Sequence, residues 1–136
     1  YTAKAEELKS YPFTLIGVDA EEAQKCMDKN NQTTCFINGN TLLIDLGEER
    51  TITSFHYLPD QSEYNKGVIA AYEISVGTDS NAVNQLVAKD EFSNIKSNPI
   101  LQSVYFTPVN ARYVQLKATR MIHDGEPMGL AEIGIQ

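Results

Sequence analysis

The sequence predicts an all-β fold, an eight-stranded antiparallel jelly-roll β-sandwich, because short β-rich runs alternate with turn-forming residues along most of the chain. Apart from a short polar stretch at residues 2–10 that could form a helical turn, no apolar pattern with a period of 3.6 extends over a useful length. Eight runs rich in β-branched and aromatic residues are present instead. They are FTLIGV (13–18), TLLIDL (41–46), TITSFHYL (51–58), AAYEISV (70–76), QLVA (85–88), SVYFT (103–107), ARYVQLKA (111–118) and AEIGIQ (131–136).

Within several of these runs, apolar and polar residues alternate. Tyr72, Ile74 and Val76 alternate with Glu73 and Ser75, as expected for strands with one buried face and one solvated face. Turn formers separate the runs at Gly47, Pro59, 77–81, Asn98 with Pro99, Pro108 and Asp124 with Gly125. Any chemistry is therefore expected on the connections between strands.

Length and charge limit the possible functions. The 136 residues fit a single domain, 1–136, with one core. The net charge of -7 disfavours nucleic acid, whose binding depends on cationic residues, and no stretch is long and apolar enough for membrane insertion. The chain opens with YTAKAEELKSY, which lacks the features of a secretory signal, so either a signal was removed or the chain is an excised domain. We expect a domain excised from a larger secreted protein.

Four segments, in this order and spacing, resemble the coagulation factor 5/8 type C (discoidin-like, galactose-binding-like) family. They are DKNNQTTC (28–35), LLIDLGEERTITSFHYLPD (42–60), AAYEISVGTDS (70–80), and ARYVQLKA (111–118) followed by GLAEIGIQ (129–136). The resemblance implies an eight-stranded jelly roll, in agreement with the run count. Three positions depart from the family pattern: Lys29 replaces a loop glycine, Cys35 a tryptophan, and Asp60 an arginine common in sugar-binding members.

The same resemblance implies a structural calcium site. Its ligands would come from one polar segment and from the last strand, since calcium takes six to eight oxygen ligands from carboxylates, carbonyls and hydroxyls. Carried over by position, these ligands are Lys25, Asp28, Asn30, Thr33, Ala131 and Glu132. The alternative is that 28–34 forms an ordinary solvated turn, which Asp and Asn favour on their own account.

Cys26 and Cys35 are the two cysteines of the chain, and they flank the proposed calcium ligands 28–33. One disulfide is expected in an oxidising compartment, which fits an extracellular, cell-surface or periplasmic location. A bridge would pre-form the metal segment by restricting the unfolded chain. Two buried thiols acting as small apolar side chains are the alternative.

The resemblance points to a non-catalytic carbohydrate-binding module, similar to family 32 modules, that tethers a linked glycoside hydrolase to glycans containing neutral or N-acetylated hexose. Asp60, Tyr64, Asn65, His123 and Met128 are the candidate ligand-binding residues, at the loop rim formed by 60–65 and 123–128. A structural or protein-interaction domain that packs on a catalytic neighbour without binding sugar is the alternative.

A glycosidase using two carboxylates from among Glu63, Asp124 and Glu126, near His123, is the third reading. A domain of this size offers little cleft, and the sequence contains no nucleophile elbow and no zinc motif, so we expect no enzyme activity from the domain alone. The absence of Trp also predicts weak sugar binding, because Trp supplies the largest stacking surface.

Overall fold

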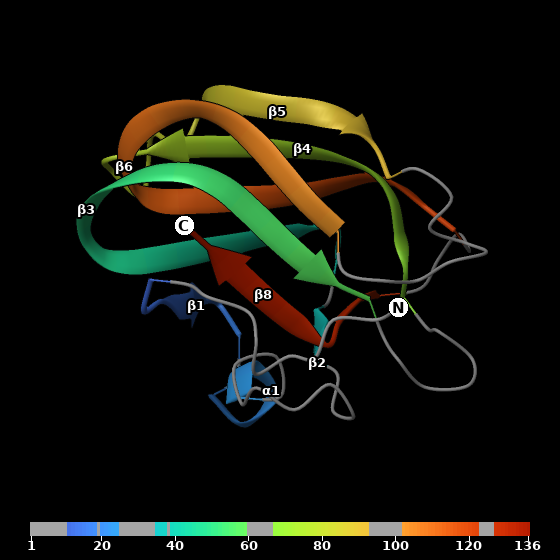
Figure 1. The fold of residues 1–136 in the computed structure, drawn as a ribbon. Helices are drawn as coiled ribbons and strands as arrows, with labels where there is room; N and C mark the ends of the chain where they lie inside the picture. The colour runs from blue at the N-terminus through green and yellow to red at the C-terminus, as the bar shows by residue number, and fades with distance from the viewer. Residues whose placement is uncertain are drawn as a thin grey trace.

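The structure, a computed structural model, describes residues 11–18, 20–24, 35–37, 39–59, 67–92, 102–122 and 127–136, and it confirms the antiparallel all-β fold. The elements are β1 (Thr14–Ile16), α1 (Ala20–Gln24), β2 (Cys35–Ile37), β3 (Thr41–Leu58), β4 (Ile69–Gly77), β5 (Gln85–Glu91), β6 (Gln102–Met121), β7 (Met128–Leu130) and β8 (Glu132–Ile135) (Figure 1). Within the described residues, no helix is long and apolar enough to cross a membrane.

Two long, curved strands, β3 and β6, build both layers of the sandwich (Figure 1). The first half of β3 pairs with the second half of β6, which continues to β4 and β5, while β1 lies on the other side of β3. The second half of β3 pairs with the first half of β6 and with β8. A separate two-stranded sheet joins β2 to β7.

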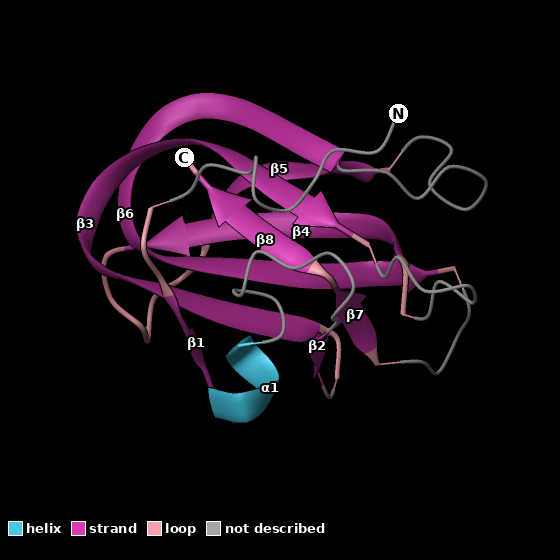
Figure 2. Cartoon of the chain, turned by 60° about the horizontal axis from the view of Figure 1, so that its bottom comes forward, coloured by secondary structure: helices cyan, strands magenta, loops and turns pink. Residues whose placement is uncertain are grey.

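The predicted runs correspond to these strands with two kinds of difference. The runs 41–46 and 51–58 form one strand, β3, and the runs 103–107 and 111–118 form one strand, β6, because the expected turns are bends and bulges in continuous strands. The three-residue strands β2 and β7 and the five-residue helix α1 were not predicted. The helix lies beside β1 and β2 (Figure 2).

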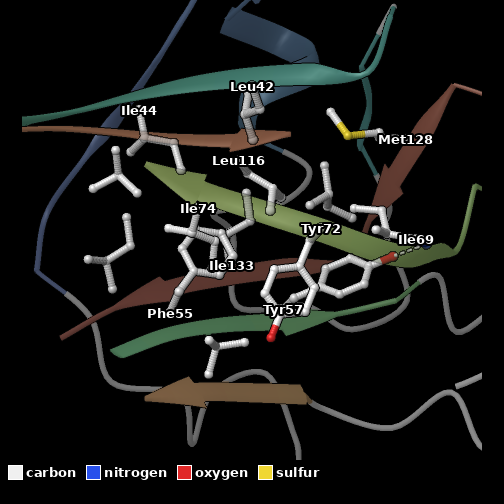
Figure 3. Packing of buried hydrophobic residues seen from close by; sticks show 14 of the residues in the cluster. Leu42, Ile44, Phe55, Tyr57, Ile69, Tyr72, Ile74, Leu116, Met128 and Ile133 are labelled. Carbon is white, nitrogen blue, oxygen red and sulfur yellow. Dashed lines mark hydrogen bonds between the residues drawn. The ribbon is translucent and has the colours of Figure 1, made fainter. Parts of the chain in front are cut away.

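Alternating side chains from both layers form one core (Figure 3). Leu42, Ile44, Ile74 and Leu116 come from the first layer, and Phe55 comes from the second; all five are fully buried or nearly so. Aromatic rings fill the end of the core near β7. Here the ring of Phe92 stacks on Tyr72 with centroids 4.5 Å apart and lies 5.4 Å from the ring of Tyr57.

The hydroxyl of Tyr57 joins two backbone segments at this end of the core. Its buried hydroxyl donates to the carbonyl oxygen of Gly129 at 3.1 Å and accepts from the backbone N–H of Ile69 at 3.2 Å. Tyr57→Phe leaves both backbone groups buried without this partner, so we expect the free energy of unfolding to fall by about 2 to 4 kcal/mol. Tyr105→Phe is the matched control: its side chain is 74% exposed, so the change should stay within about 0.5 kcal/mol. Urea titration of both variants measures this difference, and equal losses would contradict the assigned role of Tyr57.

A buried histidine lies on the outer face of the second layer. His56 is 6% exposed, and its two ring nitrogens contact the hydroxyls of Ser54 at 3.1 Å and Ser103 at 2.8 Å. The exposed ring of Tyr105 meets the imidazole edge to face, with centroids 6.1 Å apart. Burial lowers the pKa of His56, and a hydrogen bond with the Gln136 side chain offsets part of this effect. The neutral imidazole therefore connects β3 and β6 to the end of the chain.

This lowered pKa predicts a stability that depends on pH. In the unfolded chain His56 binds a proton near its ordinary pKa of about 6.5, whereas the folded protein resists protonation until a lower pH. The stabilising contribution is thus complete above pH 6.5 and is lost as the pH falls toward the folded-state pKa. We expect the urea midpoint of the wild type to fall between pH 7 and pH 5, and that of His56→Gln to fall less. If the urea midpoints of the two proteins fall equally between pH 7 and pH 5, groups other than His56 cause the pH dependence of stability.

Candidate ligand and metal site

Three segments that carry predicted site residues, 25–34, 60–66 and 123–126, lie outside the described residues, but the structure fixes the residues on either side of each one. These flanking residues converge on one stretch of chain, 127–132, which contains β7 and the start of β8. The described flanks of the three segments therefore meet on one base, residues 127–132.

Both flanks of 60–66 are bound to this base. On one side, the carbonyl oxygen of Leu58 accepts from the N–H of Ala131 at 2.9 Å. On the other, the carbonyl oxygen of Gly67 accepts from the N–H of Gly129 at 2.9 Å. Gly67 has a φ of 70°, and a Cβ there would lie far inside contact distance of the Gly129 nitrogen and the Pro127 carbonyl oxygen. Only glycine allows this approach without displacing the backbone.

The flanks of 123–126 lie at the same place. The N–H of Ile122 donates to the carbonyl oxygen of Val68 at 3.0 Å, next to the contact between Gly67 and Gly129. The described flanks of 60–66 and 123–126 therefore share one short network of backbone hydrogen bonds. The pairing of 60–65 with 123–128 in one rim stays a prediction, because 60–66 and 123–126 lie outside the described residues.

The proposed metal segment 25–34 is attached to the base from the other side. Cys35 follows it and pairs with Leu130 in the two-stranded sheet. Before it, α1 carries Glu22, whose carboxylate accepts from the N–H of Phe36 at 3.2 Å. This hydrogen bond joins the helix that precedes 25–34 to the strand that follows it.

Two predicted metal ligands lie in the described part of the site. Ala131 is fully buried, and Glu132 is 3% exposed at the point where β8 begins beside Leu58. A carboxylate oxygen is a ligand that calcium prefers, and this is the role that the family resemblance assigns to Glu132. The other four, Lys25, Asp28, Asn30 and Thr33, lie outside the described residues, and the described residues alone contain no group of three or more His, Cys, Asp or Glu that could hold a metal ion.

The structure corrects one predicted sugar contact. Met128 is fully buried in the core cluster, at the start of β7 and paired with Ile37, so its side chain does not reach the rim (Figure 3). Methionine commonly fills gaps in an apolar core, and Met128 does so here. The remaining candidates, Asp60, Tyr64, Asn65 and His123, lie outside the described residues.

Cys35 is fully buried and carries a free thiol in the structure. Its proposed partner, Cys26, lies outside the described residues, so the bridge stays a prediction for protein made under oxidising conditions. The sequence analysis did not predict the contacts that hold this site together, which involve Glu22, Tyr57, Gly67 and Gly129. A glycine directly before an apolar run was the one signal available for Gly67.

Known structures with sugars bound share this fold. A family 32 module from Clostridium perfringens, in complex with GalNAc-β-1,3-galactose, is similar with a TM-score of 0.73 and 20% identity, covering 97% of this chain and 96% of that one. The family 32 module of NanJ from the same species, in complex with galactose, has a TM-score of 0.70 and 22% identity, covering 97% and 95%.

A larger protein contains a similar part. A glycoside hydrolase 29 family member from an unknown rumen bacterium is 31% identical with a TM-score of 0.69, covering 89% of this chain but 21% of that protein. No curated protein matches the sequence. The F5/8 type C domain family matches residues 17–133, nearly the whole chain. On that match, together with the sandwich described above, the chain belongs to the F5/8 type C domain family.

Proposed function

We propose that this domain is a non-catalytic carbohydrate-binding module that tethers a linked glycoside hydrolase to glycans outside the cytoplasm, in an extracellular, cell-surface or periplasmic setting. The observation that carries the proposal is the attachment of both 60–66 and 123–126 to the hydrogen-bonded pair Gly67 and Gly129. When the flanks of two polar segments are held together by backbone hydrogen bonds, the segments are suited to recognising a small ligand through a few convergent side chains.

The proposed ligand is a neutral or N-acetylated hexose, bound by Asp60, Tyr64, Asn65 and His123. Carboxylate and amide groups suit paired sugar hydroxyls, and a tyrosine ring suits the C–H face of a pyranose. The relatives solved with galactose and with GalNAc-β-1,3-galactose support this class of ligand. The similar part of a glycoside hydrolase 29 family member supports a linked hydrolase as partner.

A calcium ion is the proposed structural cofactor, held by Lys25, Asp28, Asn30, Thr33, Ala131 and Glu132. Bound there, the ion would neutralise the buried Glu132 carboxylate and tie 25–34 to the start of β8. The position of Ala131 and Glu132 beside Leu58 connects this site to the flank of 60–66, because Leu58 accepts the hydrogen bond from Ala131. The ion would thus stabilise residues 127–132, to which the flanks of the candidate sugar-binding segment 60–66 are hydrogen-bonded.

Titration of isotope-labelled protein with galactose and N-acetylgalactosamine tests the sugar site by NMR. We expect the amide signals of Asn65 and His123 to move together, with a dissociation constant of about 1 mM, or roughly -4 kcal/mol, because the site offers one aromatic ring. Asn65→Ala should weaken binding about tenfold through the loss of a hydrogen bond. Asn81→Ala, in the exposed turn after β4, is the matched control and should bind like the wild type.

The second candidate function is a spacer that packs on a catalytic neighbour without binding sugar. The burial of Met128 favours the spacer, because the Met128 side chain is then not available to contact a sugar at the rim. Saturating sugar that shifts no signal at 60–66 or 123–126 would support the spacer and contradict the rim site.

A further inference from the structure

A groove of about 240 Å³ lies between β5 and β6, away from the proposed rim site. It is lined by Gln85, Leu86 and Val87 from β5 and by Thr107, Pro108 and Val109 from β6. These two segments belong to different layers of the sandwich: β5 is the last strand of the first layer, and the first half of β6 borders β3 in the second. The groove therefore runs along an open side of the sandwich, between two strand edges.

Irregular strand pairing shapes both walls of the groove. In β5, Ser75 pairs with Leu86 and Ile74 pairs with Ala88, so Val87 is an extra residue in a bulge. In β6, the three residues 106–108 stand opposite the single residue Thr53. Bulges redirect side chains and are frequent next to functional sites, and a proline in an edge strand prevents another strand from pairing there. A small ligand suits these walls better than an added strand.

The groove is far from the rim. Ile69 starts β4 next to Gly67 and Val68 at the rim, whereas Val76, seven residues further along β4, pairs with Gln85 at the groove. At about 3.3 Å per residue, the two places are roughly 20 Å apart along the strand. One monosaccharide cannot contact both.

The chemistry of the lining matches an uncharged ligand with hydroxyl groups. None of the six lining residues carries a charge. The Gln85 amide and the Thr107 hydroxyl can each donate and accept hydrogen bonds, while Leu86, 52% exposed, and Pro108 present aliphatic surface. A pyranose ring has the same mixture of hydroxyl edges and C–H faces, and a volume of this size holds a single ring.

We propose that the groove between β5 and β6 is a second saccharide site, which binds one neutral hexose residue independently of the rim. The class of ligand rests on the proposed function, whereas the location rests on the groove itself. Two sites roughly 20 Å apart would let one domain hold a branched or long glycan at two points, and simultaneous contact strengthens binding without new contacts at either site.

The same NMR titration with galactose and N-acetylgalactosamine tests the groove, with Leu86 and Val109 as reporter amides. We expect these signals to shift in the wild type and in Asn65→Ala. In the double variant Gln85→Ala with Thr107→Val, binding at the groove should weaken at least about tenfold while the rim signals still move. Both substituted side chains are exposed, so the variant should keep the wild-type unfolding midpoint, and Thr107→Val alone gives a nearly isosteric second test.

Tyr105→Ala is the control, because Tyr105 is an exposed aromatic residue on β6 outside the groove lining. It should leave the groove shifts unchanged; if it abolishes them, the sugar binds on the outer sheet face and the groove is overturned. Shifts confined to the rim also contradict the second saccharide site, but they remain consistent with the proposed function. Shifts confined to the groove support it and contradict the rim site. With no shift at either place in tens of millimolar sugar, both proposals fail.

Discussion

Gly67→Ala is expected to destabilise the domain by roughly 4 kcal/mol. Two costs add: a side chain at a φ of 70° strains the backbone, and the new methyl group collides with the backbone of Pro127 and Gly129. The clash involves backbone atoms on the opposite side, so no side-chain rotation relieves it. Since the free energy of unfolding of a small domain is about 5 to 15 kcal/mol, this loss would be a large share of it.

Gly39→Ala separates these two costs. Gly39 also has a positive φ, 87°, but a Cβ there would meet nothing within 4 Å. Its loss should be about 1 to 2 kcal/mol, from backbone strain alone. Urea unfolding of the two variants and the wild type measures the difference. If Gly39→Ala and Gly67→Ala lose the same free energy, the close approach of Gly67 to the 127–132 segment does not contribute.

The effect should extend from stability to binding. Gly67 and Gly129 hold the flanks of 60–66 and 123–126 together, so displacing them moves the segments that carry Asn65 and His123. Any Gly67→Ala protein that stays folded should therefore bind galactose more weakly than Gly39→Ala does. Equal binding by the two variants would show that the rim does not depend on this base.

The strands were predictable where burial alternates along a run. Ile74 and Val76 point into the core, and Glu73 and Ser75 are half-buried on the other face, as the period-2 pattern indicates. The pattern could not show that β3 and β6 continue through their expected turns. Gly47 has a φ of 83° and accommodates a bend, and its N–H donates at 2.8 Å to Asp45. Asp45 also pairs with Arg112 at 2.9 Å, and that guanidinium holds the pKa of the carboxyl below its usual range.

The site was harder to predict because its base depends on contacts between distant parts of the chain. The strands β2 and β7 have three residues each and are separated by about ninety positions, so neither has a periodic signal of its own. Without β7, Met128 could be read as part of a binding loop. Because β7 was not predicted, the structural roles of Tyr57 and Gly67 were not predicted either. Both residues hydrogen-bond to the backbone of Gly129 in β7.

Calcium removal is expected to produce the other large loss of stability. A ligand that binds only the folded state stabilises it by about 4 kcal/mol when present at a thousand times its dissociation constant, and chelation removes this contribution. The two described ligands of the proposed site, Ala131 and Glu132, lie where the base meets β8, and Cys35, which follows 25–34, pairs with the same base. Emptying the site should therefore loosen the start of β8 together with the metal segment.

Urea midpoints with calcium and with a chelator measure this effect in the wild type, Asp28→Ala and Glu132→Gln. The wild-type midpoint should fall on chelation, and the midpoints of both variants should fall little, since each has lost a proposed ligand. Glu48→Gln is the matched control, because Glu48 is an exposed carboxylate in a surface ion pair with Arg50, and it should respond to chelation as the wild type does. A midpoint that chelation leaves unchanged in the wild type would contradict the structural calcium, and a full response in Asp28→Ala would place the ion elsewhere.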